Sequence, residues 1–434
     1  MRQKEALQIL ELGHNVLLTG SAGSGKTFLL NQYISYLRKK GIGVAITAST
    51  GIAATHIGGR TIHSWAGIGI KDELTSRNLQ TLKKRSYLKK QFEKTQVLII
   101  DEISMLHAHR LDMVDRVCQA FKGNQLPFGG IQVILSGDFF QLPPISSGSG
   151  EAEFVYKSDV WQEMDVRVCY LNEQHRQNDK KMTHILQSLR RNEITSEIDA
   201  LLRERMNQEI KMDERPVRLF THNVDVDSIN NAELKKISAP EYRYRMTNSG
   251  DKKLVEALKK NCLAPEELVL KKGASVMFVK NKFQDEKVVY VNGSSGVVIG
   301  FGEENLPIVK LSSGKEVLVT IDSWTIDSEQ EILARINQIP LRLAWAITVH
   351  KSQGMTLERA EIDLSKSFGY GMGYVALSRL VSLEGLYLLG INEMAYKLDP
   401  HVFAFDKELL VLSEEAKNNK TPKTYKRKKS VLGI

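Results

Sequence analysis

The chain has 434 residues, 42% of them hydrophobic, and a formal net charge of +9. This length predicts two or three domains, and the hydrophobic fraction is enough for real cores. The three cysteines, Cys118, Cys169 and Cys262, lie far apart without a C-x-x-C pair, so neither a disulfide framework nor a zinc site is indicated and a reducing compartment is expected. No signal peptide or bilayer-spanning hydrophobic run is found, and no membrane partner is expected. The positive charge suits a polyanion such as nucleic acid.

The first motif along the chain is a phosphate-binding loop in "LLTGSAGSGKTFLL", residues 17–30. It fits the pattern G-x-x-x-x-G-K-[ST], with a buried strand predicted before it and a helix predicted after it. Lys26 is expected to reach the β- and γ-phosphates of a nucleotide, and the Thr27 hydroxyl to ligate Mg²⁺. An ordinary glycine turn is the alternative, which this context disfavours. The residues expected to contact the nucleotide here are Gly20, Gly23, Ser24, Gly25, Lys26 and Thr27.

Three more buried strands are predicted at residues 43–47, 96–100 and 131–137, mostly separated by helical patterns. Such alternation predicts a parallel α/β sheet, whose ligand site lies beyond the carboxyl ends of its strands. A polar cluster follows each of these strands, so one site can collect them all. The polar and basic stretch 70–92 interrupts the alternation and is expected to form a small excursion from the first lobe.

Two of these strand ends carry candidate catalytic residues. Asp101 and Glu102 follow the apolar "VLII", where Asp101 is expected to hold Mg²⁺ and Glu102 to polarise the attacking water. Gln141, in "GDFFQLPP", is positioned to sense the γ-phosphate and the lytic water, although its two prolines also fit a plain turn.

The second half of the chain predicts another sheet with an insertion. Its strands are expected at residues 217–223, 341–354, 360–364 and 385–392. Between them, residues 273–322 contain short β-rich runs separated by glycine, asparagine and serine turns, which predicts a small inserted antiparallel barrel. The stretch 417–429 has seven basic and no acidic residues, and disorder is predicted for it.

Phosphoryl transfer also needs mobile positive charge, for which Arg176 in "LNEQHRQ" and Arg379 in "VALSRL" are candidates. An arginine supplied across a cleft would make hydrolysis depend on closure of the two lobes. Most arginines instead lie at the surface as solubilising groups, and the spacing alone leaves that alternative open.

The motifs taken together resemble the superfamily-one helicases of the Pif/RecD-like branch. The match runs in family order through "GSAGSGKT", "TASTGIAA", "GGRTIHSW", "LIIDEISML", "GDFFQLPP", "LNEQHRQ", "ITVHKSQGMTLERA" and "YVALSR", and residues 115–135 resemble the Pif signature segment. The resemblance implies an α/β fold with two RecA-like P-loop motor domains, an inserted SH3-like β-barrel and a small insertion in the first lobe. The expected boundaries are 1–175 for lobe one (with a wedge-bearing insertion at about 66–92), 176–271 and 326–416 for lobe two, 272–325 for the barrel, and 417–434 for a basic tail.

The same resemblance implies roles for particular residues. Arg176 and Arg379 become arginine fingers, Gln3 an adenine reader, and Gly354 a neighbour of the nucleotide. Phe139, Phe140 and Trp65 offer rings on which bases can stack, while core packing remains the alternative for the two phenylalanines. The residues implied to contact DNA are Thr50, His63, Phe140, Thr221, Asn223, Thr348, His350 and Lys351.

The expected function is therefore an ATP- and Mg²⁺-dependent DNA helicase that moves along single-stranded DNA, 5′ to 3′ by resemblance alone, and unwinds duplex, forked or structured DNA. The expected form is a monomer, or a dimer on DNA, in a bacterial cytoplasm at the nucleoid. The alternatives are a P-loop switch and a nucleic-acid-binding ATPase that separates no strands.

Particular residues discriminate among these alternatives. A GTPase needs N-K-x-D, whereas the nearest stretch, "NKFQ", has Gln284 in the last position. A small-molecule kinase does not need a second lobe with "HKSQG" and "ALSR". Asp101-Glu102 is followed by Ile103-Ser104, which disfavours an RNA helicase of the D-E-A-D type. A scaffold with a dead ATPase does not fit a complete hydrolytic set, namely Lys26, Glu102, Gln141, Arg176 and Arg379.

Overall fold

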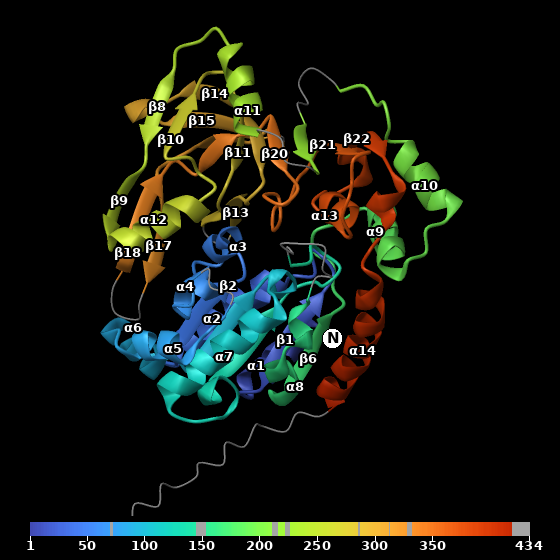
Figure 1. The fold of residues 1–434 in the computed structure, drawn as a ribbon. Coiled ribbons are helices and arrows are strands. Elements are labelled where there is room, and N and C mark those ends of the chain that lie inside the picture. The colour runs from blue at the N-terminus through green and yellow to red at the C-terminus, as the bar shows by residue number, and fades with distance from the viewer. Residues whose placement is uncertain are drawn as a thin grey trace, which may run out of the picture.

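The computed structural model describes residues 1–69, 73–144, 153–210, 216–221, 226–284, 287–311, 313–327 and 332–418. It has two parallel-sheet lobes and an antiparallel β region that lies beside lobe two and above lobe one (Figure 1). Among the described residues, no helix combines the length and the apolar character that crossing a bilayer requires.

Lobe one is built on a six-stranded parallel sheet in the order β3-β2-β4-β5-β1-β6. Its strands are β1 (Asn15–Gly20), β2 (Val44–Ala48), β3 (Arg60–Thr61), β4 (Val97–Asp101), β5 (Gln132–Ser136) and β6 (Val166–Leu171). The central strands β1, β4 and β5 are buried along their whole length, as their continuous apolar runs predict. The helices of the lobe are α1 (Gln3–Glu11), α2 (Lys26–Lys39), α3 (Gly51–His56), α4 (Ile62–Trp65), α5 (Ser76–Lys83), α6 (Ser86–Lys94), α7 (Ala108–Lys122) and α8 (Asp159–Glu163).

Helices α5 and α6 fall in the stretch expected to be an excursion. α6 packs against lobe one through Leu88 and Phe92, both fully buried, and α5 contributes the buried Leu82 to the same core. The Phe92 ring lies 4.7 Å from the ring of Trp65 and 4.6 Å from that of Phe121. The described part of this insertion is thus joined to the lobe-one core, and its wedge role stays a prediction.

Lobe two has a four-stranded parallel sheet in the order β20-β7-β21-β22. Its strands are β7 (Val217–Phe220), β20 (Ala346–Thr348), β21 (Ala360–Leu364) and β22 (Leu386–Ile391). Its helices are α9 (Lys180–Arg191), α10 (Ser196–Arg203), α11 (Val226–Lys235) and α13 (Met372–Leu377).

The antiparallel region is larger than the predicted 272–325. Its main sheet has the order β16-β15-β14-β11-β19 around its own apolar core, and smaller sheets pair β10 with β8, β12 with β13, and β18 with β17 and β9. The elements are β8 (Tyr242–Arg245), β9 (Thr247–Gly250), α12 (Lys252–Asn261), β10 (Glu267–Leu270), β11 (Ser275–Phe278), β12 (Lys282–Gln284), β13 (Lys287–Tyr290), β14 (Ser295–Phe301), β15 (Pro307–Leu311), β16 (Glu316–Leu318), β17 (Asp322–Asp327), β18 (Ile332–Gln338) and β19 (Leu341–Leu343).

The predicted strand 341–354 is in fact divided between two sheets. β19 pairs with β11 of the antiparallel region, whereas β20 pairs with β7 of lobe two. Both halves belong to one apolar run, so hydropathy alone gives no sign of the change of sheet. The antiparallel region also touches lobe one, where Asn292 Nδ2 lies 2.9 Å from His56 Nε2.

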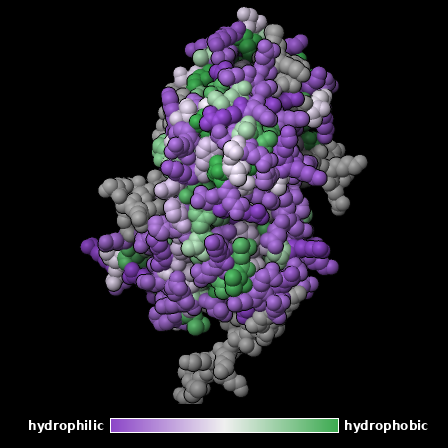
Figure 2. Space-filling view, turned by 90° about the vertical axis from the view of Figure 1, so that its right-hand side faces the viewer, coloured by the Kyte–Doolittle hydropathy of each residue, from purple (hydrophilic) through white to green (hydrophobic). Residues whose placement is uncertain are grey.

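The last helix, α14 (Pro400–Asn418), returns to lobe one, although it was expected in lobe two (326–416). The Ser413 hydroxyl accepts a hydrogen bond from the Tyr170 amide at 3.1 Å, and Ala416 shares an apolar cluster with Met1. The helix runs down the side of lobe one in Figure 1. Figure 2 views that side, where hydrophilic residues predominate and hydrophobic ones form small, separate groups. The rest of the predicted basic tail, 419–434, lies outside the described residues.

Candidate functional site

The phosphate-binding loop joins β1 to α2 at the carboxyl edge of the lobe-one sheet, and its glycines are required by close approach. A Cβ on Gly20 would lie 2.6 Å from the Leu171 carbonyl oxygen, and one on Gly23 would lie 2.5 Å from Gln174 Oε1. Gly25 precedes α2 with a left-handed φ of +84°. The chain thus turns tightly into a helix start, where backbone N–H groups and the helix dipole favour an anion.

Lys26, Thr27 and Gln3 lie around this loop as predicted for nucleotide contacts. Lys26 Nζ donates to the carbonyl oxygens of Gly20 and Ser21, at 2.8 and 3.0 Å. Burial lowers the pKa of Lys26, although the nearby carboxylates of Asp138 and Glu102 oppose that shift. Thr27 is exposed at the first turn of α2. The Gln3 amide donates to the Ser24 and Gly25 carbonyls at 3.4 and 3.5 Å, which places it next to the loop.

The two acidic candidates lie at the end of β4. Asp101 is 7% exposed, and Glu102 has a left-handed backbone with φ 51° and ψ 47°. Burial and the neighbouring Asp101 raise the pKa of Glu102. Gln353, from lobe two, donates from Nε2 to Glu102 Oε2 at 3.0 Å. A carboxylate with a raised pKa is better matched to accepting a proton from water near neutral pH.

The predicted sensor and fingers meet where the two lobes face each other. Arg379 is 1% exposed, and its Nη2 donates to Gln141 Oε1 at 3.4 Å. Arg176 Nη1 donates to the Ser378 carbonyl at 3.0 Å, next to Arg379 in sequence. Burial and the adjacent Arg379 lower the pKa of Arg176 to about 9, because two like charges lie close together. Two guanidinium groups therefore gather where an anion would neutralise their repulsion.

The residues present fit a nucleotide with Mg²⁺. The loop leads into a helix start, where backbone N–H groups suit phosphate oxygens, and the charges of Lys26 and Arg379 both act on Glu102. The buried Asp101 carboxylate and the exposed Thr27 hydroxyl are the hard oxygen ligands that Mg²⁺ prefers.

Comparison with known proteins shows the family of this chain. The model of the PIF1-like helicase family matches residues 2–211, and that of the DNA helicase Pif1 2B domain matches residues 253–301. The chain is 45% identical, over 96% of its length, to the ATP-dependent DNA helicase Pif1 of Psychrobacter sp. (strain PRwf-1), of which it covers 72%. The chain belongs to the PIF1-like helicase family. It is 38% identical over 93% of its length to the ATP-dependent DNA helicase PIF1 of Xenopus laevis, but spans only 63% of that relative.

The fold agrees with the same family. The crystal structure of Bacteroides sp Pif1 in complex with ADP-AlF4 matches with a TM-score of 0.82 and 30% identity, covering 94% of this chain and 96% of that one. The expected fold class is confirmed: the two parallel-sheet lobes are the RecA-like domains of the family, and the antiparallel region contains its 2B domain.

The residues predicted to contact DNA lie on or beside four elements, α3, α4, β7 and β20. Thr50 caps α3 by accepting from the Ala53 amide at 3.3 Å, and Thr348 accepts from the Lys351 amide at 3.2 Å. Thr221 is 2% exposed, and its hydroxyl donates to the Asp363 carbonyl at 3.4 Å. The side chain of His63, on α4, is half-buried, whereas that of His350, after β20, is exposed. Asn223 lies outside the described residues, and the DNA contacts stay predictions.

Base stacking by the aromatic candidates is contradicted by their burial. Phe140 is 2% exposed, and the guanidinium carbon of Arg190 lies 4.4 Å from its ring centroid. The Phe139 ring lies 5.3 Å from that of Phe405 on α14, and Trp65 is 1% exposed. Their ring faces are covered by the protein, which leaves no place for a base. The sequence does not show this because α14, which covers both phenylalanines, lies more than 250 residues later.

Sequence reasoning missed several polar residues beside the cleft. Gln353 lies within the recognised "HKSQG", so its motif was a usable signal. Asp138 likewise begins the recognised "DFFQLPP". Arg190 ends an amphipathic helix and Tyr374 lies in a short apolar one, and neither position differs in sequence from ordinary helix residues.

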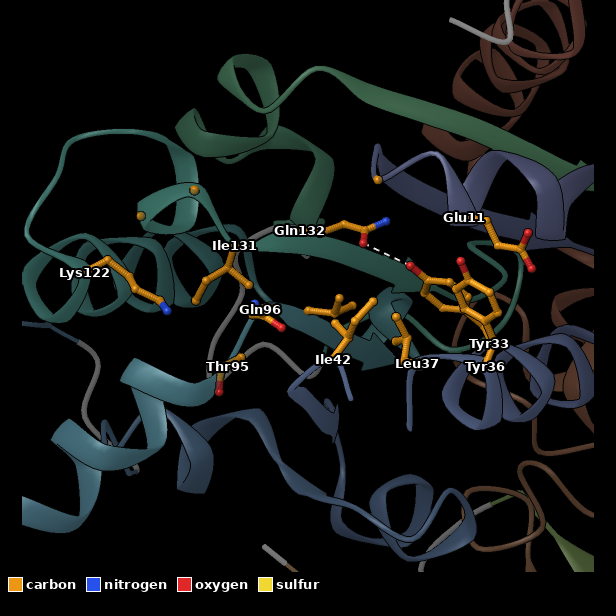
Figure 3. A pocket seen from close by; sticks show the side chains of 14 residues that line it. Glu11, Tyr33, Tyr36, Leu37, Ile42, Thr95, Gln96, Lys122, Ile131 and Gln132 are labelled. Atoms are coloured by element: carbon orange, nitrogen blue, oxygen red, sulfur yellow. Dashed lines mark hydrogen bonds between the residues drawn. The ribbon is translucent and has the colours of Figure 1, made fainter. Parts of the chain in front are cut away.

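A separate cavity of about 400 Å³ lies at the opposite edge of the lobe-one sheet, where its strands begin (Figure 3). The Tyr33 hydroxyl donates to Gln132 Oε1 at 3.0 Å, and Gln132 Nε2 donates to the carbonyls of Leu10 and His14. Both ends of this buried amide are thus used within the fold, and the cavity has no role in the nucleotide site.

Proposed function

We propose that this ATP-dependent DNA helicase translocates 5′ to 3′ along single-stranded DNA by closing its two RecA-like lobes on ATP, with the residues described above in the roles predicted for them. One observation carries the proposal. Two of the proposed catalytic side chains of lobe one already contact a side chain of lobe two, since Gln353 bonds Glu102 and Arg379 bonds Gln141. Hydrolysis and the relative position of the lobes therefore share the same contacts.

Binding begins with the loop and its flanking side chains. The backbone N–H groups at the start of α2 and the Lys26 ammonium hold the phosphates, and the Gln3 amide binds the base, which its position next to the loop supports. Mg²⁺, ligated by Thr27 and Asp101, would neutralise phosphate charge when bound.

Hydrolysis then uses groups from both lobes. Glu102 orients the attacking water and accepts its proton, for which its raised pKa suits it. Gln141 positions that water against the γ-phosphate, while Arg379 and Arg176 stabilise the charge that develops on it. When the γ-phosphate leaves, Arg379 loses its anionic partner, so the cleft opens and the grip on DNA resets.

DNA is the macromolecular partner, and the positive charge of the chain supports a polyanion in the channel. We infer that the strand passes the strand ends that carry Thr50, His63, Thr348, His350 and Lys351, because phosphate contacts of this kind bind without reading bases. One copy contains every proposed catalytic group, which supports a working monomer, with a second copy joining on forked DNA. A DNA partner and bacterial relatives support action at the nucleoid.

The test compares ATPase rates with and without single-stranded DNA, together with unwinding of duplexes that carry a 5′ or a 3′ tail. We expect DNA to stimulate hydrolysis and only the 5′-tailed duplex to open. Lys26→Ala should abolish ATP binding, whereas Glu102→Gln should retain binding and lose turnover. Stimulated hydrolysis without unwinding of either duplex would reduce the chain to a nucleic-acid-binding ATPase, and unwinding from a 3′ tail would reverse the polarity.

A further inference from the structure

A buried polar cluster joins the two lobes beside Gln141, the predicted γ-phosphate sensor. Arg190, at the end of α9, donates from Nη1 to Asp138 Oδ1 at 2.7 Å and to the Tyr374 hydroxyl at 3.1 Å. Asp138 follows β5 in lobe one and its side chain is 1% exposed, whereas α9 and α13 belong to lobe two. The ion pair therefore bridges the lobes in a place that solvent scarcely reaches.

The hydrogen bonds of the Tyr374 hydroxyl are fully used in this cluster. The hydroxyl donates its one proton to Asp138 Oδ2 at 3.1 Å. It accepts from Arg190 Nη1 and, at 3.2 Å, from the backbone amide of Ala22, which lies in the phosphate-binding loop. A hydroxyl has one donor and two acceptor positions, so this single oxygen connects α9, the strand end of β5 and the loop with no capacity left over.

Asp138 in turn touches the predicted sensor. Gln141 Nε2 donates to Asp138 Oδ2 at 3.4 Å. Because a carboxylate accepts but does not donate, it holds the NH₂ end of the Gln141 amide and turns the carbonyl end towards Arg379. Asp138 is favoured in its ionised form, because the positive charges of Arg190 and Lys26 outweigh the effect of burial and lower the pKa of Asp138.

The backbones of the two lobes also meet here. A Cβ on Gly371, just before α13, would lie 2.8 Å from the Phe140 carbonyl oxygen and 3.0 Å from that of Gln141. Gly371 has a left-handed φ of +76°. The helix that carries Tyr374 therefore begins in direct contact with the segment that carries the sensor, and a shift of one moves the other.

We propose that Arg190 and Tyr374 are positioning residues of the ATPase, which act through Asp138 to set the Gln141 amide and the phosphate-binding loop according to the position of lobe two. This inference rests on the proposed function. It assigns no chemistry to either residue, since both act through Asp138 and the Ala22 amide, and it gives the buried ion pair between the lobes a role.

The experiment compares two removals of one hydroxyl, Tyr374→Phe and Tyr170→Phe. Tyr170 is a matched control, because its hydroxyl also accepts from Arg190, at 2.7 Å, but its own proton goes to Asp406 on α14 at 2.9 Å, away from the sensor. For each full-length variant, kcat and KM for ATP are measured at saturating single-stranded DNA, together with the Kd for that DNA and the thermal midpoint.

We expect Tyr374→Phe to lower kcat by about tenfold to a hundredfold, the effect of one hydrogen bond to a charged group, while KM and Kd stay within about threefold. Tyr170→Phe should keep kcat within about twofold, even if both variants lose similar thermal stability. Arg190→Lys should retain more turnover than Arg190→Gln, since it keeps the charge next to Asp138.

The inference would be overturned if Tyr374→Phe had the same kcat as wild type, or if kcat fell equally in both tyrosine variants. The cluster would then only hold the two lobes together. If Arg190→Gln does not fold, the tyrosine pair still decides. Measurements on the wild-type enzyme distinguish failure of the proposed function from failure of this inference. If the wild type shows no DNA-stimulated ATPase and no unwinding, the proposed function fails. If it shows both, the variants test only the roles of Arg190 and Tyr374.

Discussion

The nucleotide side and the DNA side of this helicase hold their functional side chains in different ways. On the nucleotide side, hydrogen bonds cross from one lobe to the other. Glu102 bonds Gln353, and Gln141 bonds Arg379. Along the predicted strand channel, the side-chain hydroxyls of Thr50 and Thr348 accept hydrogen bonds from their own segments, and the side chain of His350 is exposed. A site that breaks a covalent bond needs fixed geometry, whereas a channel that releases DNA in each cycle is better served by independent, weaker contacts.

Among the substitutions that test this difference between the two sides, Arg379→Ala should have the largest effect on ATPase activity. Its guanidinium is buried between the lobes and meets Gln141, so its loss should lower DNA-stimulated ATPase on the order of a thousandfold, as for other arginine fingers. Binding of ATP and of single-stranded DNA should change only a few-fold, because the loop and the channel are intact. The measurement is steady-state ATPase at saturating DNA, with Arg203→Ala, an exposed arginine on α10, as control. A stimulated rate near wild type would refute closure of two lobes on ATP.

Phe140→Ala tests whether this residue packs within the protein or stacks on DNA bases. A ring buried under Arg190 should cost about 3–5 kcal/mol of unfolding free energy when it is removed. If the ring instead stacked on bases, the substitution would weaken DNA binding and leave stability unchanged. Denaturant unfolding and DNA titration of the same preparation decide this, with the milder Phe140→Leu as a second variant in case the alanine form does not fold.

Features that depend on a short stretch of sequence could be predicted, whereas contacts with distant segments could not. Lys26, Asp101 and Glu102 lie at the helix start and the strand end that the sequence predicts, because such local features are visible in a short stretch of sequence, while their roles stay predictions. Phe140 was assigned wrongly because its cover comes from α14, and the run 341–354 was assigned to one sheet because nothing local marks the change from β19 to β20. Contacts that depend on distant segments were the ones that could not be predicted.

Gln353→Leu tests whether a contact across the lobes sets the pKa of Glu102, the proposed proton acceptor. Glu102 must be ionised to accept a proton, so kcat should fall as pH drops through its raised pKa. The Gln353 amide donates to the carboxylate and favours its charged form, and removing it should raise the pKa further. The acid limb of the pH–kcat profile should then move to higher pH by about one unit, which costs up to about tenfold below that limb. A fall in rate that is uniform over pH would mean that Gln353 only holds the lobes together.

Lys351→Ala should give the smallest effect, and it tests the DNA side directly. Lys351 follows the end of β20, where the strand is predicted to pass, and a lysine that binds one phosphate without reading a base should weaken binding about equally for all sequences. It should also reduce the slope of log Kd against log salt concentration by about one, since one fewer counterion is released. Lys39→Ala is the matched control, because Lys39 is an exposed lysine at the end of α2, towards the edge of the sheet where its strands begin. Because channel contacts are independent of the cleft, kcat at saturating DNA should be unchanged in both variants. An unchanged salt slope with a lowered kcat would instead place Lys351 in the hydrolytic network, and the two sides of the molecule would then be less separate than their hydrogen bonds indicate.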